Sequence, residues 1–339
     1  MSDNKELLAL FDLFYDDKPI TFEIIDTSRS KKDFRVVVIG TFEKGEKGVI
    51  KLADNDFTFP EKIKMWQRTV LEYIKLGYYC PKISKDKTGT FPIVTYNGHS
   101  CVAYAEEYVK YRPAEFRSND DKIEVPIQKF ARDALIMTAK IASKHFSYTN
   151  YPSGYCLFER FCPSDETDEV LENALAWKEY AETLPNEFLP QVNRIWNLWI
   201  ANRNDLEQIY KKLPTSVFQA DLNPSNILLD EREKFVGVYD FNLCGKDTVL
   251  NYLFRDTFCD GYQEVLDELL CRLKIIAEYY QFSTLEKETA LMMYRCLKPL
   301  FYMADVLKAL GDDKLAIQKL LDETEHYLTL DIDFGAYMN

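Results

Sequence analysis

Polar and hydrophobic residues follow different patterns in the two parts of the chain. The N-terminal part contains short segments rich in β-branched and aromatic residues, which favour strands. We predict strands at 20–27, 34–42 and 48–53, helices at 4–15 and 61–76, and a hairpin at 91–96 and 101–105. The Asn97-Gly98 pair is a strong turn signal for that hairpin. This part of the chain therefore predicts a small antiparallel sheet accompanied by helices.

Beyond Pro113, apolar residues recur mainly at helical spacing. The predicted helices are 126–147, 165–184, 186–211, 251–256, 261–281, 285–309 and 313–328. The change of pattern predicts an α+β fold with two lobes. Residues 1–106 would form a small antiparallel β-sheet lobe, and residues 107–339 would form a larger helical lobe.

One β-hairpin interrupts the helical region, within residues 216–245. Two short apolar strands, 227–229 and 235–239, flank a charged turn at 230–234. Pro224 restricts the loop before the first strand, because its ring fixes φ. Asp221, Asn226 and Asp240 are consequently expected at one end of this hairpin.

These three polar residues suit one kind of chemistry. Carboxylate and amide oxygens bind Mg²⁺ when a phosphate chain supplies further ligands. Phosphoryl transfer also needs a carboxylate that accepts the proton of the attacking hydroxyl. We interpret Asn226 and Asp240 as Mg²⁺ ligands and Asp221 as the base. The alternative is a polar turn between two core strands, in which the acids are simply solvated.

The same stretch resembles the catalytic loop of protein-kinase-like phosphotransferases, and more narrowly the aminoglycoside phosphotransferase and choline kinase family. That loop commonly contains His-Gly-Asp-Leu-His-Pro-Xaa-Asn, followed by a strand and an Asp-Phe pair. This chain has the corresponding run 219–226 and then Asp240-Phe241. Gln219 and Asn223 replace the two histidines, and Asn242 stands where a glycine or a second acid is common. The first histidine braces the loop by hydrogen bonding, a role that the donor and acceptor of glutamine can also fill.

This resemblance implies a two-lobed protein-kinase-like fold and a kinase that uses Mg²⁺ with ATP or GTP. The γ-phosphate would pass to a hydroxyl of a small-molecule substrate. Lys51 would contact the α- and β-phosphates, and the turn that contains Ser28 and Ser30 would cover the phosphates. The backbone at Glu107 and Tyr108 would bind the purine ring. For Lys51 the alternative is a solvent-facing residue on an edge strand.

The expected partner of Lys51 is missing from its usual place. In the family, a glutamate on the helix predicted at 61–76 pairs with the strand lysine. The polar residue on the buried stripe of that helix is Gln67, whereas Glu72 lies nearly opposite. The sequence therefore predicts that the lysine–glutamate pair is absent or rebuilt.

Composition limits the remaining classes of function. The 339-residue chain has a formal net charge of −13, which argues against a nucleic-acid partner. No apolar run reaches the ~18 residues of a membrane-spanning helix, and the polar N-terminus favours a cytoplasmic protein without a membrane partner. The eight cysteines and three histidines are scattered, so neither a disulfide framework nor a zinc site is expected.

The negative charge suits a cationic acceptor, but solubility alone explains it equally well. Five acidic residues are candidates for holding such an acceptor, or are simply solvated helix positions: Asp256, Asp260, Glu264, Asp267 and Glu268. Two further hypotheses stay open beside the kinase. One is a pseudokinase that binds nucleotide or a partner without turnover, and the other is a helix-rich scaffold. The acceptor and the choice between ATP and GTP are not encoded in these motifs.

Overall fold

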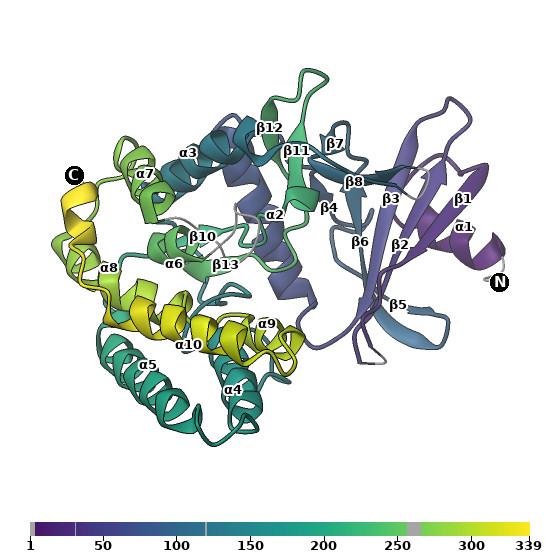
Figure 1. The fold of residues 1–339 in the computed structure, drawn as a ribbon. Coiled ribbons are helices and arrows are strands. Elements are labelled where there is room, and N and C mark those ends of the chain that lie inside the picture. The colour runs from purple at the N-terminus through teal and green to yellow at the C-terminus, as the bar shows by residue number, and fades with distance from the viewer. Residues whose placement is uncertain (1–3, 31, 119–120, 256–265) are drawn as a thin grey trace. The chain divides into compact units, whose positions relative to one another are not determined.

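The N-terminal sheet has six strands, all paired in antiparallel fashion (Figure 1). The strands are β1 (Thr21–Asp26), β2 (Phe34–Thr41), β3 (Lys47–Asp54), β4 (Ile83–Ser84), β5 (Ile93–Tyr96) and β6 (His99–Glu107). Their order is β1-β2-β3-β6-β4, and β5 also pairs with β6. The computed structural model describes residues 4–30, 32–118, 121–255 and 266–339. Within them the predicted antiparallel sheet is confirmed.

The two faces of this sheet have different environments. Residues paired directly across antiparallel strands share a face, so alternate residues of β2 and β3 point to opposite sides. Helix α1 (Asn4–Asp12) covers one face, where Leu7 and Phe11 pack with Val38 and Ile50 in one hydrophobic cluster. On the other face, Lys51 lies opposite Val37 on β2 and Tyr104 on β6.

Helix α2 (Pro60–Lys75) begins with a proline, which is well suited to a first turn. Its buried side includes Ile63, Trp66 and Val70. The Trp66 ring meets the Tyr104 ring edge to face, with centroids 6.1 Å apart. Since Tyr104 shares a face with Lys51, α2 packs on the side of the sheet that α1 does not cover.

A second, three-stranded sheet belongs to the same part of the molecule. Its order is β12 (Phe235–Val238), β11 (Ile227–Leu229) and β7 (Arg112–Pro113), and the 3₁₀ turn η2 (Pro224–Asn226) precedes β11. Gly237 is required on β12, because a Cβ there would lie 1.8 Å from the carbonyl oxygen of Tyr79. Tyr79 in turn exchanges backbone hydrogen bonds with Val236 and Val238. The hairpin β8 (Glu115–Ser118) and β9 (Asp121–Glu124) lies beyond β7 in sequence.

The remaining elements are mostly helical. They are η1 (Ile127–Lys129), α3 (Ala131–Ala142), α4 (Glu169–Ala181), α5 (Leu189–Tyr210), α6 (Val249–Phe254), α7 (Leu266–Ala277), α8 (Thr284–Leu297), α9 (Met303–Ala309), α10 (Lys314–Thr329) and η3 (Phe334–Tyr337). A two-stranded sheet joins β10 (Ser216–Phe218) and β13 (Gly245–Asp247). Helix α5 packs against α8 and α10, and α4 packs against α9 (Figure 1). The buried Trp199 of α5 donates to the carbonyl oxygen of Cys296 on α8 at 3.0 Å.

Contacts divide the chain into two compact units. The first contains Met1–Val125, Cys162–Ser164 and Pro224–Cys244, and the second contains Pro126–Phe161, Asp165–Asn223 and Gly245–Asn339. The boundary predicted at residue 106 falls within the first unit, at the end of β6. The predicted α+β class is confirmed.

Two predicted helices differ from the structure. The helix predicted at 126–147 begins as η1 and continues only as α3, which ends at Ala142. The helix predicted at 285–309 is divided into α8 and α9, because Tyr302 adopts a left-handed backbone conformation with φ 55° between them. The periodic pattern detected both segments but not these interruptions.

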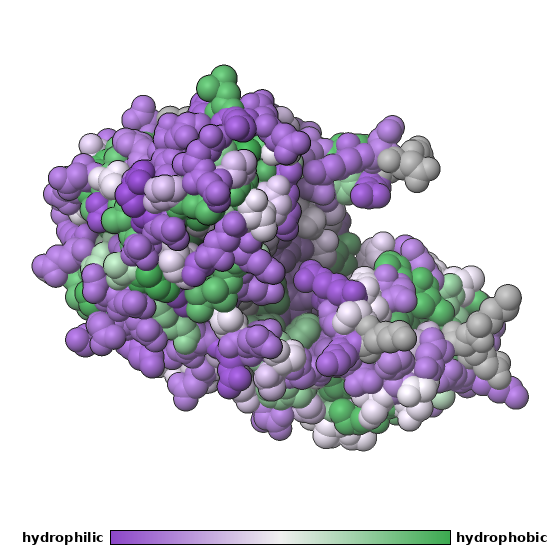
Figure 2. Space-filling view, turned by 60° about the horizontal axis from the view of Figure 1, so that its bottom comes forward, coloured by the Kyte–Doolittle hydropathy of each residue, from purple (hydrophilic) through white to green (hydrophobic). Residues whose placement is uncertain are grey.

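The surface agrees with the composition. On the face drawn in Figure 2, hydrophilic residues predominate and hydrophobic ones form separate patches. Large apolar residues that are strongly exposed, such as Leu315 and Ile20, lie far apart in the sequence. Among the described helices, none has the length and apolar character needed to cross a membrane.

Candidate active site

The hairpin of β11 and β12 carries two of the predicted site residues at one end. Ile227 pairs with Val238, and the backbone N–H of Tyr239 donates to the carbonyl oxygen of Asn226 at 3.1 Å. Asn226 and Asp240 therefore flank the last pair of the hairpin. Asp240 has φ 58°, a left-handed conformation that aspartate tolerates better than most residues. The local pattern that predicted this hairpin is thus confirmed.

Lys51 forms an ion pair within the large sheet. Its Nζ lies 2.7 Å from Oε2 of Glu106, and both side chains are largely buried. The strand register explains the contact. Lys51 is paired with Tyr104, and Glu106 is two residues further along β6, on the same face. Diagonal neighbours on one face are within reach of long side chains.

This ion pair decides between the two alternatives predicted for the partner of Lys51. The pair is rebuilt from β6 rather than lost. Gln67 instead donates to the carbonyl oxygen of Ile83 at 2.8 Å, so it joins α2 to β4. Glu72 pairs with Lys75 at the surface. One signal was available in the sequence: Glu106 directly follows the apolar run 101–105, and a carboxylate that continues such a strand requires a partner.

The electrostatic surroundings keep Lys51 charged. Burial by itself would lower the pKa of this ammonium group, but the field of Glu106, with smaller contributions from Tyr104 and Asp240, raises the pKa well above its ordinary value. Asp240, at the end of the hairpin, is therefore among the charges that raise the pKa of Lys51. Lys51, Asn226 and Asp240 all belong to the first unit.

The oxygen donors of the hairpin fit a Mg²⁺ ion that shares its coordination with phosphate. Asn226 offers an amide oxygen and Asp240 a carboxylate, and Mg²⁺ is commonly bound by one or two such protein groups together with substrate phosphates. The described residues contain no group of three or more His, Cys, Asp or Glu side chains able to hold a metal. One amide and one carboxylate oxygen suit a site that phosphate oxygens complete.

Asp221 lies in the second unit, on the segment that follows β10. Gln219 donates from Nε2 to the carbonyl oxygen of Asp221 at 2.9 Å, so it braces the loop as expected. Ala220 has φ 77°, where glycine is usually preferred. Asn223 donates from Nδ2 to Oδ1 of Asp221, and the Tyr155 hydroxyl donates to the same oxygen at 3.3 Å. The predicted convergence of Asp221 with Asn226 and Asp240 stays a prediction.

The other nucleotide-binding candidates lie on the first unit. The Ser28 hydroxyl and the Arg35 backbone exchange hydrogen bonds, and the Ser30 hydroxyl accepts from the N–H of Lys32, so both side chains stabilise their turn. The backbone N–H of Glu107 donates to the carbonyl oxygen of Lys82.

At Tyr108, the exposed ring lies beneath the ammonium group of Lys47, 4.6 Å from its centroid. The phosphate and purine roles of these four residues, Ser28, Ser30, Glu107 and Tyr108, stay predictions.

The structure describes only some of the acidic residues that were candidates for holding a cationic acceptor. Asp267 and Glu268 are exposed in the first turn of α7, and Glu268 pairs with Arg272 at 3.0 Å. Asp256, Asp260 and Glu264 lie outside the residues that the structure describes.

Comparison with known proteins identifies the fold. No family model matches the sequence, and no curated protein matches it. Among solved structures, a microcompartment-associated aminopropanol kinase is similar over 97% of this chain and 96% of its own, with 13% identity and a TM-score of 0.54. An amicoumacin kinase in complex with AMP-PNP, Ca²⁺ and Ami covers 98% of this chain and 97% of its own, with 14% identity and a TM-score of 0.53. The chain therefore has the α+β fold of these small-molecule kinases.

Proposed function

We propose that the protein is a Mg²⁺-dependent kinase that transfers the γ-phosphate of ATP or GTP to a hydroxyl group of a small molecule. The observation that carries this proposal is that Lys51, Asn226 and Asp240 all lie in the first unit. The buried Lys51 stays charged, and the charge of Asp240 contributes to this. Asp240 and Asn226 flank the same hairpin within that unit. A metal-bound triphosphate requires a cation together with oxygen ligands of this kind.

Each residue has a distinct role in the proposed reaction. Lys51 binds the α- and β-phosphates, while Asn226 and Asp240 hold Mg²⁺, which neutralises charge on the phosphate chain when it is bound. Asp221 orients the acceptor hydroxyl and accepts its proton, and the donors Tyr155 and Asn223 help to fix the orientation of the carboxylate. Positioning and electrostatic stabilisation account for most of the catalysis in phosphoryl transfer.

The ligands of the similar structures support the proposal. The amicoumacin kinase is described with AMP-PNP and Ca²⁺, a nucleotide analogue and a divalent cation, and the other neighbour is described as a kinase of aminopropanol. The pseudokinase alternative depended partly on the missing glutamate partner. Because Glu106 supplies that partner from β6, this reason for expecting inactivity no longer applies.

The test is transfer of labelled phosphate from Mg-ATP or Mg-GTP to a panel of amino alcohols, choline, aminoglycosides and macrolides. Asp221→Asn is expected to reduce transfer about 10²–10⁴-fold, the usual contribution of a general base, with Mg-nucleotide binding retained in calorimetry. Asp205→Asn, at an exposed position on α5, is the matched control and should transfer at the parental rate. Equal transfer by the parent and Asp221→Asn would show that the assignment of the base is wrong.

A further inference from the structure

The hydrogen bond between Tyr155 and Asp221 joins residues that are 66 positions apart in the sequence. The Tyr155 hydroxyl lies 3.3 Å from Oδ1 of Asp221. Burial raises the pKa of Tyr155 to about 12, and Asp221 and Glu169 add to this against the opposing effect of Arg255. The phenol therefore stays protonated and donates its hydrogen across the neutral pH range.

The backbone around Tyr155 is held on its N-terminal side by a buried carboxylate, that of Asp247. The Ser153 hydroxyl donates to Asp247 at 2.6 Å, and the Ser153 N–H donates to the carbonyl oxygen of Lys246 at 3.0 Å. Asn251 donates from Nδ2 both to the carbonyl oxygen of Tyr155 and to Asp247. The main chain at Tyr155 is thus bonded directly to the network of β13 and α6.

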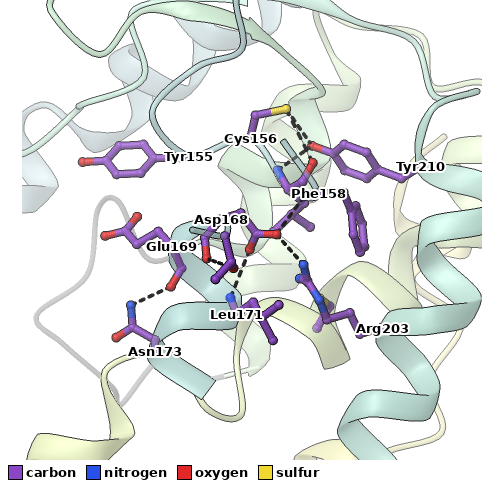
Figure 3. Close-up of polar contacts among 12 residues, drawn as sticks. Tyr155, Cys156, Phe158, Asp168, Glu169, Leu171, Asn173, Arg203 and Tyr210 are labelled. Atoms are coloured by element: carbon purple, nitrogen blue, oxygen red, sulfur yellow. Dashed lines mark hydrogen bonds and ion pairs between the residues drawn. The ribbon is translucent and has the colours of Figure 1, made fainter. Parts of the chain in front are cut away.

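A second buried carboxylate holds the C-terminal side (Figure 3). The Phe158 N–H donates to Oδ2 of Asp168 at 2.9 Å, while Oδ1 of Asp168 accepts from the Leu171 N–H and caps α4. Arg203 of α5 forms an ion pair with the same carboxylate. Phe158 itself has φ 61°, an unfavourable conformation for a bulky residue that this contact helps to maintain. The loop of residues 151–158, which contains Tyr155, is therefore anchored on both sides of Tyr155 by groups from β13 and several helices.

The Tyr155 ring has a further support, which comes from α4. The guanidinium group of Arg255 stacks on the ring, and Arg255 pairs with Oε2 of Glu169 at 3.2 Å. Oε1 of Glu169 accepts from the Tyr302 hydroxyl at 2.7 Å. In Figure 3 the Tyr155 side chain points away from the Cys156–Tyr210 contact, toward the side on which Glu169 lies. The anchored loop thus places one aromatic side chain, and its hydroxyl reaches Asp221.

We infer that Tyr155 is a positioning residue for the base Asp221, held in place by the loop anchors and by the Arg255–Glu169 pair. This inference rests on the proposed function and deepens it. A hydrogen bond to an ionised carboxylate stabilises the charged form, so Tyr155 keeps Asp221 ready to accept a proton. Asn223 donates to the same oxygen atom. The two hydrogen bonds together restrict rotation of the carboxylate.

A residue with only a packing role would behave differently. Tyr155→Phe keeps the ring on which Arg255 stacks and removes only the hydroxyl. If the hydroxyl positions the base, this variant loses turnover and changes the pH dependence of turnover, while nucleotide binding is retained. Among the described residues, the charged and titratable groups near this contact include Arg255, Glu169 and the Tyr302 hydroxyl. All three remain in the variant.

The first measurement needs no substrate. Thermal unfolding midpoints are measured for the parent, Tyr155→Phe, Asp221→Asn and the double variant, near neutral pH and in mild acid. We expect non-additive shifts near neutral pH that become additive in acid, where the carboxylate is protonated. Tyr151→Phe, an exposed tyrosine in the same loop, serves as control and should give additive shifts at both pH values.

The second measurement uses Mg-ATP, with phosphate transfer to the acceptor identified from the panel and to water. Tyr155→Phe is expected to lower kcat about ten-fold, as for the loss of one hydrogen bond to a charged group, with an unchanged KM for Mg-ATP. The acidic limb of its pH–kcat profile should move to higher pH. Additive unfolding shifts together with superimposable pH profiles would overturn the inference. Absence of turnover by the parent would instead contradict the kinase proposal, and the unfolding cycle would still decide whether Tyr155 holds Asp221.

Discussion

Two buried ion pairs, one in each unit, differ in how many other structural contacts their side chains make. Arg203 and Asp168 are bonded within the helical unit, where Asp168 also caps α4 and Arg203 lies over the Phe158 ring. Lys51 and Glu106 pair on the face of the sheet that α1 does not cover, and the nearby charge of Asp240 acts on Lys51. The first pair also caps a helix and packs on an aromatic ring. The second pair instead places charged side chains where a phosphate chain is proposed to bind.

The comparison shows that burial of an ion pair does not by itself indicate its role. Removing two charges from water is costly, and the mutual attraction of the pair often only offsets that cost. A pair that also caps a helix and anchors a loop is retained for stability. For a pair that neither caps a helix nor anchors a loop, binding or catalysis is the better explanation. Substitution of each pair can test this difference in role.

The largest effect on stability is expected for Asp168→Asn. Asparagine is a good helix cap, but the change leaves the buried Arg203 guanidinium without its counter-ion. Breaking a buried pair in this way typically costs about 3–5 kcal/mol, which chemical denaturation would measure. Asp313→Asn is the matched control, because Asp313 caps α10 at an exposed position. Equal, small losses in the two variants would contradict the structural role of the Arg203 pair.

The pair in the sheet can be replaced without leaving either charge unpaired. Lys51→Met combined with Glu106→Leu removes both charges and fills the space with apolar groups, which is often neutral or stabilising by about 1–4 kcal/mol. We expect the free energy of unfolding to be maintained or raised and Mg-nucleotide affinity, measured by calorimetry, to fall at least about ten-fold. A double variant that unfolds readily yet binds nucleotide normally would show that this pair supports stability and not nucleotide binding.

The smallest effect concerns strain beside the proposed base. Ala220 has φ 77°, and a non-glycine residue in this region costs about 1–2 kcal/mol. Glycine removes that strain but makes the unfolded chain more flexible, so Ala220→Gly should stabilise the protein by about 0.5–1 kcal/mol. Ala316→Gly, within α10, should instead destabilise it by a similar amount. Destabilisation by both changes would mean that the Ala220 conformation carries no strain.

Local sequence patterns predicted the elements that depend on neighbouring residues. Asn97-Gly98, the apolar strand at 227–229 and the charged turn after it were sufficient to predict their hairpins. The partner of Lys51 was not predicted, because it depends on the register between β3 and β6, which are about fifty residues apart in the sequence.

The Tyr155–Asp221 contact was missed for a related reason. Tyr155 lies in a loop without periodicity, and only the carboxylates of Asp168 and Asp247 determine where that loop places the ring. Small strands such as β7 and β13 were also missed, since they are too short for an alternating pattern to be visible. The features that could not be predicted from the sequence were therefore mainly contacts that depend on tertiary structure.

The origin of the Lys51 partner has a consequence for control of the protein. Glu106 and Lys51 sit on adjacent strands that are joined by backbone hydrogen bonds, so their alignment is decided when the sheet folds. A displacement of α2 would leave this lysine and its counter-ion where they are. An inhibitor designed to pull that helix outward would consequently leave the Lys51–Glu106 pair intact.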